Sequence, residues 1–202
     1  MSGMGRLVVC LTGLSSYLVL QLPLSVKRCP HPLPNRASSG KIPAMASNRH
    51  VLRTDLYANR NSAKGRVVMR LFRIGQALPP GLRRFYHPFY YCVVDIVMGI
   101  SLPLQTEVGP GLILRHGQGV VISWKSRIGA ECEIHQNVTL GEKDGAAPQL
   151  GNNVTIGANA VLLGGVVIGN GAHVGAGTVV LSDVPQGAIA IGRKGEIVPA
   201  RR

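Results

Sequence analysis

Aliphatic residues recur at every sixth position through much of the C-terminal half of the chain. A period of six fits neither the 3.6-residue repeat of a helix nor the two-residue alternation of a strand. It is typical of a parallel β-helix, in which three hexads complete one triangular coil and successive coils stack. The repeating residues are Ile128, Ile134, Leu140, Leu150, Ile156, Leu162, Ile168, Val174 and Val180.

A second set of positions, four residues after Ile122 and after each of these heads except Leu140, carries small or branched side chains and is also expected to face inward. Its members are Ser126, Cys132, Val138, Val154, Ala160, Val166, Ala172, Thr178 and Val184. Glycine often follows the head directly, which we attribute to corner conformations that a Cβ disfavours. These glycines are Gly129, Gly151, Gly157, Gly169 and Gly175. A glycine-rich β-sandwich is the alternative fold.

The repeat is broken at two places. Val108, Leu114 and Val120 extend it upstream, and a two-residue slip between Val120 and Ile122 then resets the register. Residues 141–149 interrupt it again and predict a loop expelled from the solenoid. With eighteen residues per coil and two added by the slip, position 116 is expected to stack on position 136, about 4.8 Å away.

Charge and composition divide the 202-residue chain into parts. Residues 1–100 carry 14 Lys and Arg against 2 Asp and Glu, whereas residues 101–202 carry 8 against 7. A basic half can meet nucleic acid, anionic lipid or an acidic polymer, but no nucleic-acid motif accompanies it. We therefore expect no nucleic-acid partner and leave open a peripheral membrane contact through the basic half.

The N-terminal region precedes the repeat in two parts. Residues 1–44 combine an apolar run (7–24) with a Pro-, Ser- and Arg-rich stretch that indicates disorder. They are interpreted as an extension upstream of Met45, a membrane anchor or a cleaved signal. Residues 45–100 are predicted to be helical and to cover the end of the solenoid at 101–192, with a basic tail at 193–202. An aromatic cluster could provide that cover: Phe85, Tyr86, Phe89, Tyr90 and Tyr91.

The chain resembles the left-handed β-helix acyltransferases over roughly residues 90–198. The resemblance is carried by GISLP (99–103), VGPGLILRHGQGVVI (108–122), IHQNVTLG (134–141) and the hexads of 150–185. These segments look like serine acetyltransferase and its relatives that acetylate capsular and exopolysaccharides, and we expect the colanic-acid-type O-acetyltransferases to be nearest. The resemblance implies a left-handed coil, acetyl-CoA as co-substrate, no metal, a homotrimer with active sites between subunits, and a cytoplasmic location.

His116 matches the catalytic base of that family and lies where the repeat is broken. A neutral imidazole can take the proton of an acceptor hydroxyl and pass it to the leaving sulfur. The expected neighbours are Gln136, which could hold the imidazole or the acceptor, and His135, which is either a second polar contact or a plain corner residue. Cys132 is expected in the core.

This chain lacks four acidic or basic residues that serine acetyltransferases have in or near the acceptor site. An acid beside the base, an acid that orients it and an Arg-His pair in the expelled loop are replaced by Arg115, Ser101, Ala146 and Ala147. A site for zwitterionic serine needs a cation and an anion, so a sugar hydroxyl is the preferred acceptor and L-serine the alternative. Glu107, Asp95, Ser101 or a backbone carbonyl could orient His116 instead.

The donor site is implied by the same resemblance. Pantetheine is expected to lie along a groove between subunits at Gly141, Ala158 and Ala176, where small side chains allow close approach to backbone amides. CoA phosphates could pair with Arg193 and Lys194, and Lys143, Arg201 and Arg202 are further candidates. The non-catalytic alternative is a β-helix scaffold. A zinc-dependent γ-class carbonic anhydrase would need His116, His135 and His173 to converge.

Overall fold

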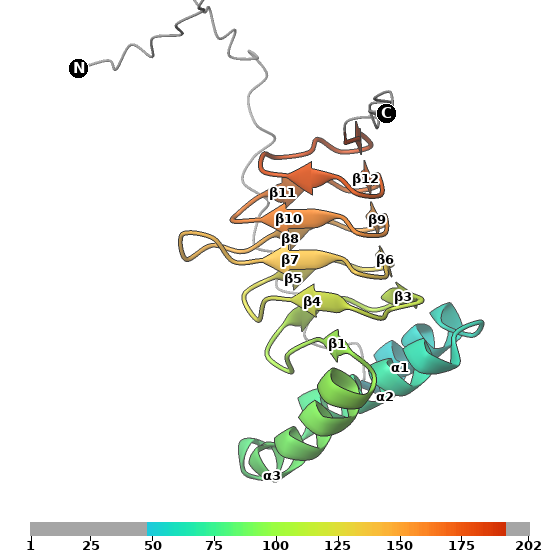
Figure 1. Ribbon diagram of the computed structural model, residues 1–202. Coiled ribbons are helices and arrows are strands. Elements are labelled where there is room, and N and C mark those ends of the chain that lie inside the picture. Colours follow the sequence, from blue (N-terminus) through green and yellow to red (C-terminus); the bar gives the residue numbers. More distant parts are fainter. Residues whose placement is uncertain (1–47, 193–202) are drawn as a thin grey trace, which may run out of the picture. The chain divides into compact units, whose positions relative to one another are not determined.

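The computed structural model describes residues 48–192, in which three α-helices and a π-helix precede fourteen short strands (Figure 1). The interpretations of residues 1–44, of Cys10 and Cys29 and of the tail at 193–202 concern residues outside this range. None of the helices in the described part is long and apolar enough to span a bilayer. The helices are α1 (Asn48–Ala58), α2 (Ala63–Ala77), α3 (Pro80–Tyr90) and η1 (Tyr91–Val97).

Three parallel sheets form the walls of the solenoid, and each of the first four coils contributes one strand to each wall, whereas the last coil contributes strands only to sheets A and C. Sheet A contains β1 (Ile100–Ser101), β4 (Val120–Ile122), β7 (Thr139–Gly141), β10 (Val161–Leu163) and β13 (Val179–Val180). Sheet B contains β2 (Glu107–Val108), β5 (Arg127–Ile128), β8 (Gln149–Leu150) and β11 (Val167–Ile168). Sheet C contains β3 (Ile113–Arg115), β6 (Glu133–His135), β9 (Thr155–Ile156), β12 (His173–Val174) and β14 (Ile189–Ala190).

The predicted fold, a parallel β-helix preceded by a short helical segment, is confirmed. Every head residue and every residue of the second inward set is buried, from Val108 through Val184. Cys132 lies in this core as expected, and burial raises the pKa of its thiol to about 11. The six-residue period therefore reports directly which side chains fill the prism.

The glycines after the head residues have a different physical cause from the one we expected. A Cβ on Gly129 would lie 2.3 Å from the carbonyl oxygen of Gly151, and one on Gly157 would lie 2.6 Å from the backbone nitrogen of Ala176. Neither glycine has a positive φ. Close approach of the next coil, rather than a corner conformation, therefore excludes larger residues at these two positions.

The helical segment covers the open end of the first coil, as Figure 1 shows. Val68, Met69 and Phe72 of α2 are fully buried against the core, and the Tyr90 hydroxyl donates to the carbonyl of Leu102 at 2.7 Å. The predicted aromatic cover is wrong in part: Phe85 is 83% exposed, and Phe89 and Tyr91 are also exposed. The cover comes mainly from the aliphatic and aromatic face of α2, because that helix lies directly on the first coil.

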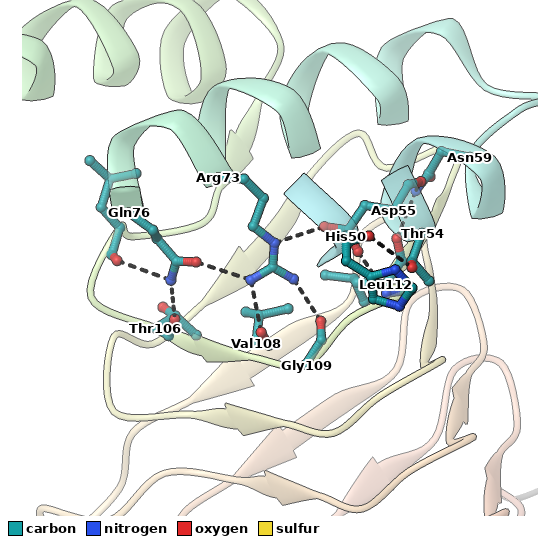
Figure 2. Close-up of polar contacts among 12 residues, drawn as sticks. His50, Thr54, Asp55, Asn59, Arg73, Gln76, Thr106, Val108, Gly109 and Leu112 are labelled. Carbon is teal, nitrogen blue, oxygen red and sulfur yellow. Dashed lines mark hydrogen bonds and ion pairs between the residues drawn. The ribbon is translucent and has the colours of Figure 1, made fainter. Parts of the chain in front are cut away.

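An ion pair fixes α1 and α2 to the first coil (Figure 2). Arg73 Nε donates to Asp55 Oδ2 at 2.7 Å, and its other nitrogens donate to the carbonyls of Val108 and Gly109 at 2.9 and 2.6 Å. Asp55 Oδ1 accepts from the backbone nitrogen of Gly111 at 2.6 Å. The pair thus satisfies backbone groups at the rim of the solenoid that have no further coil to bond to.

Candidate active site

His116 lies in a two-residue insertion at the corner between sheets C and A. Arg115 pairs with His135 and Val121 with Thr139, so the first coil takes six residue steps where the next coil takes four. His116 has a φ of 60°, and the glycine after it a φ of 30°. Asn137, Asn153 and Asn159 at other corners have φ values of 55–60° as well, so this conformation is a regular feature of the corners. The two added residues and the exposure of His116 set this corner apart from the regular wall.

The predicted stacking of position 116 on position 136 is wrong. The backbone nitrogen of Asn137 donates to the carbonyl of Gln118 at 2.8 Å, just as the nitrogen of Gly177 donates to the carbonyl of Ala158 two coils further along the same corner column. Gln118 therefore occupies the position next to Gln136. The two residues added by the slip are extruded from the column, which places His116 beside it rather than in it.

Gln136, Ala158 and Ala176 share one corner column, on the same corner as His116. The backbone nitrogen of Asn159 donates to the carbonyl of Gln136 at 3.1 Å, and the same pattern links the two alanines. The side-chain oxygen of Gln136 is buried and has no hydrogen-bond partner within residues 48–192. This corner therefore combines a protruding imidazole, an unpaired amide oxygen and small residues along the next two coils.

Glu133 organises the polar side chains next to this corner. Arg115 donates to it through Nε and Nη2 at 2.8 and 3.2 Å, and His135 Nε2 lies 3.0 Å from its Oε1. The hydrogen bonds from Arg115 hold the pKa of Glu133 below its ordinary value. His135 is thus directed towards Glu133. Sequence reasoning missed this acid, although the same twenty-residue offset that placed His135 also pairs Ile113 with Glu133.

No orienting group for His116 is supplied by the acids named from the sequence. Glu107 lies 3.2 Å from Arg127 on sheet B and is held there. Within residues 48–192, neither Ser101 nor Asp95 forms a hydrogen bond to the His116 ring. The described residues also contain no group of three His, Cys, Asp or Glu side chains that could hold a metal ion.

The expelled loop lies at the opposite corner, between the carboxyl end of β7 in sheet A and the start of β8 in sheet B, as Figure 1 shows. Lys143 and Ala146 form an antiparallel bridge that closes a tight turn, whereas Ala147 is buried. A pocket of about 360 Å³ lies beside the loop, with Lys143 and Asp183 among its lining residues. Gly141 also lies at this corner, where it pairs with Leu163. Within one chain, Gly141 and Lys143 therefore lie at a different corner from His116, Ala158 and Ala176.

Two further donor candidates, Arg193 and Lys194, lie outside the described residues, as do Arg201 and Arg202. The remaining predicted site residues thus fall into two groups on two corners. The first group comprises His116, Gln136, Ala158 and Ala176, with His135 at the end of the adjoining strand β6; the second comprises Gly141 and Lys143.

Comparison with known proteins gives consistent matches. Residues 147–182 match the bacterial transferase hexapeptide family model. The chain is 39% identical over 137 residues to a serine acetyltransferase of Helicobacter pylori, covering 65% of this chain and 79% of that enzyme. It is 35% identical to the serine acetyltransferase of Escherichia coli K12, covering 68% of this chain but only half of that enzyme.

Solved structures agree with these sequence matches. Soybean serine acetyltransferase complexed with serine superposes with a TM-score of 0.66 at 31% identity, covering 75% of this chain and 70% of that one. A serine acetyltransferase in complex with CoA gives 0.65 at 28% identity over the same shares of the two chains. The expected closeness to colanic-acid-type enzymes is not supported, because these relatives are serine acetyltransferases. Together with the hexapeptide solenoid, these matches show that the chain belongs to the serine acetyltransferase family of hexapeptide-repeat acyltransferases.

Proposed function

We propose that this chain is an acetyl-CoA-dependent O-acetyltransferase in which His116 is the general base. The observation that supports this proposal most strongly is the insertion that extrudes His116 from an otherwise regular wall, next to a corner column that includes Ala158 and Ala176. The scaffold does not need this insertion, since the same corner is built without it in the later coils. Corner residues such as Glu131 and Asn159 share the positive φ of His116, so the insertion, and not the backbone conformation, distinguishes His116 from the other corners.

The proposed reaction is a direct transfer. The His116 imidazole takes the proton of the acceptor hydroxyl while that oxygen attacks the thioester carbonyl carbon of acetyl-CoA. The tetrahedral intermediate then collapses, the carbon–sulfur bond breaks, and the imidazolium returns the proton to the leaving CoA thiolate. The products are the O-acetyl ester and CoA. In this proposal, backbone amides along the column of Ala158 and Ala176 would stabilise the developing oxyanion.

Acetyl-CoA is the proposed donor because a matching family member is known as a complex with CoA. Its pantetheine arm would follow the corner column past Ala158 and Ala176, where short side chains leave the backbone accessible. Gly141 and Lys143 would contribute from the other corner of sheet A in a neighbouring subunit. Arg193 and Lys194 remain candidates for the CoA phosphates.

L-serine is the acceptor that the relatives favour, since soybean serine acetyltransferase is known in complex with serine. A sugar hydroxyl is the second candidate, and a specific observation favours it: the expelled loop carries Ala146 and Ala147 where serine acetyltransferases have an Arg-His pair. Ala147 is buried and cannot bind a carboxylate. The acceptor therefore depends on whether another part of this chain supplies the missing cation.

A homotrimer is the assembly that this separation of groups favours. Within one chain, His116 lies at the corner where the strands of sheet A begin, and the expelled loop lies at the corner where they end. A site that uses both therefore requires two copies. The outward face of sheet A offers a neutral contact surface: Ser101, Val121, Thr139, Val161 and Val179 are stacked in register.

The proposed activity is tested by release of free CoA from acetyl-CoA with L-serine, N-acetylglucosamine, glucose and glucuronate as acceptors. We expect acceptor-dependent CoA release that falls by about 10²–10⁴-fold in His116→Ala, the range for removal of a general base. Gln118→Ala, in the same insertion region, is the control for local folding. Equal rates for wild type and His116→Ala would exclude His116 as the base, and no release with any acceptor would favour a scaffold.

A further inference from the structure

A pocket of about 480 Å³ lies between the α1–α2 turn and strand β3. Residues 58–64 line one side and residues 113–116 line the other, so that His116 stands at its edge. The volume is in the range of sites for small metabolites. The pocket has no role in the proposed donor path, which would follow Ala158 and Ala176 along the later coils at the same corner. The pocket is therefore a candidate for the acceptor side of the reaction.

The walls of the pocket are held in place by buried polar contacts. Asn59 Nδ2 donates to the carbonyls of Asp55 and Leu112 at 2.9 and 2.7 Å, and its Oδ1 accepts from the Leu114 nitrogen at 3.1 Å. Ser62 caps α2 by accepting from the backbone nitrogen of Gly65 at 2.9 Å. The turn that carries the pocket's side chains is thus bonded directly to β3, the strand that ends one residue before His116.

The pocket is cationic. Its lining includes Arg60, Lys64 and Arg115 and contains no Asp or Glu. Arg115 is neutralised by Glu133, which leaves Arg60 and Lys64 as the effective charge. Lys64 forms no ion pair within residues 48–192, and the guanidinium of Arg60 stacks on the Tyr57 ring, 4.8 Å from its centroid. The one other acid near the turn, Asp55, is paired with Arg73.

We infer that Lys64 and Arg60 bind an anionic group of the acceptor, a carboxylate or a phosphate, while the acceptor hydroxyl faces His116. This inference rests on the proposed acetyltransferase function and names the substrate class for it. Arg60 and Lys64 at the α1–α2 turn would thus supply the cation that the expelled loop lacks. The chemistry is shared by L-serine and by acidic sugars, because both present an anion a few atoms from a hydroxyl.

The experiment compares acceptor pairs that differ only in the anionic group: L-serine with L-serinamide, and glucuronate with glucose. Kinetics are measured for wild type, Lys64→Gln and Arg60→Gln. Loss of one charge-assisted hydrogen bond is expected to raise KM for the anionic member of the active pair by about 10–100-fold. KM for acetyl-CoA and for the neutral member should stay within about twofold, the ordinary range for a surface change.

Arg70→Gln is the matched control, because Arg70 is exposed on the same helix and does not line the pocket. A second readout is calorimetric binding of the anionic acceptor to His116→Asn, with and without Lys64→Gln, which does not depend on turnover. Thermal unfolding of each variant verifies that the fold is intact. The acceptor pair that the wild type acetylates shows whether the anionic acceptor is an amino acid or an acidic sugar.

Three outcomes are decisive. A wild type that acetylates none of the acceptors overturns the proposed function and this inference together. An active wild type whose KM for the anionic acceptor is unchanged by Lys64→Gln and Arg60→Gln overturns the inference alone. A rise in KM that is equal for anionic and neutral acceptors also overturns it, because it would indicate a change of pocket shape rather than loss of charge recognition.

Discussion

Asn59 shows how a single side chain connects the helical segment to the predicted site. Its amide satisfies two carbonyls and one backbone nitrogen, and the residue is only 1% exposed. Buried backbone groups left without partners cost about 1–3 kcal/mol each. The position of the α1–α2 turn beside His116 therefore depends on this one amide more than on the helical pattern around it.

Replacement of Gly65 by alanine should disrupt this contact. A Cβ at Gly65 would lie 2.3 Å from Asn59 Oδ1, the oxygen that accepts from Leu114. We expect a loss of stability of about 1–3 kcal/mol, larger than the ~1 kcal/mol that alanine gains over glycine in a helix. The measurement is urea unfolding. Gly81→Ala is the control and should be neutral or stabilising, since a Cβ at Gly81 would have no atom within 4 Å. Equal effects of the two substitutions would contradict the role of Asn59.

At the scale of elements, the solenoid strands could be predicted because each position sees the same surroundings in every coil. The head residues from Ile128 to Val180 are buried as expected. The insertion at His116 was located by the break in that period, but its partner was misassigned. The spacing does not specify which residue of the first coil lies next to Gln136. The backbone hydrogen bond from the nitrogen of Asn137 to the carbonyl of Gln118 shows that it is Gln118 and not His116.

The contacts of the helical segment could not be predicted in the same way. Asn59 and Leu114 are 55 residues apart, and Arg73 reaches Gly109 over 36. No repeat relates these elements, so periodicity gives no register between them. The pocket between Lys64 and His116 consequently had no signal in the sequence, although Arg60 and Lys64 belong to the basic half of the chain.

The Asp55–Arg73 pair should be the main link between helices and solenoid. Asp55 is fully buried, and Arg73→Met would leave its carboxylate without a cation, at a cost of about 3–5 kcal/mol. We expect Asp55→Asn and Arg73→Met each to be strongly destabilising and the double variant to lose about 1–3 kcal/mol less than their sum. Denaturant unfolding of the four proteins measures this coupling.

The control is the same double-mutant cycle on the ion pair Glu107–Arg127, because both of its side chains are more than half exposed. Its coupling should be below about 1 kcal/mol. Similar coupling energies in the two cycles would mean that the buried pair does not hold the helices to the first coil.

For the whole molecule, the three walls differ in the charge that they present outward. The outward column of sheet B includes Glu107 and Arg127, and that of sheet C includes Glu133 and His173. The described column of sheet A contains no charged residue, and Val121 and Val179 on it are 48% and 60% exposed. Neutral, partly apolar surface of this kind is typical of contacts between subunits. Sheet A also runs between the two corners that carry the predicted site residues.

Val179→Asp should therefore dissociate the proposed trimer without unfolding the chain. The side chain points outward, so the coil keeps its core, but a carboxylate buried without a partner at each contact would cost several kcal/mol. Light scattering after gel filtration should show a shift from three times 21.4 kDa to 21.4 kDa. Gln149→Asp, on the outward column of sheet B, is the control and should leave the mass unchanged. Because His116 and the expelled loop of one chain lie at opposite ends of sheet A, the monomeric variant should also lose acceptor-dependent CoA release. A trimeric Val179→Asp, or a monomer that retains full activity, would contradict a site shared between copies.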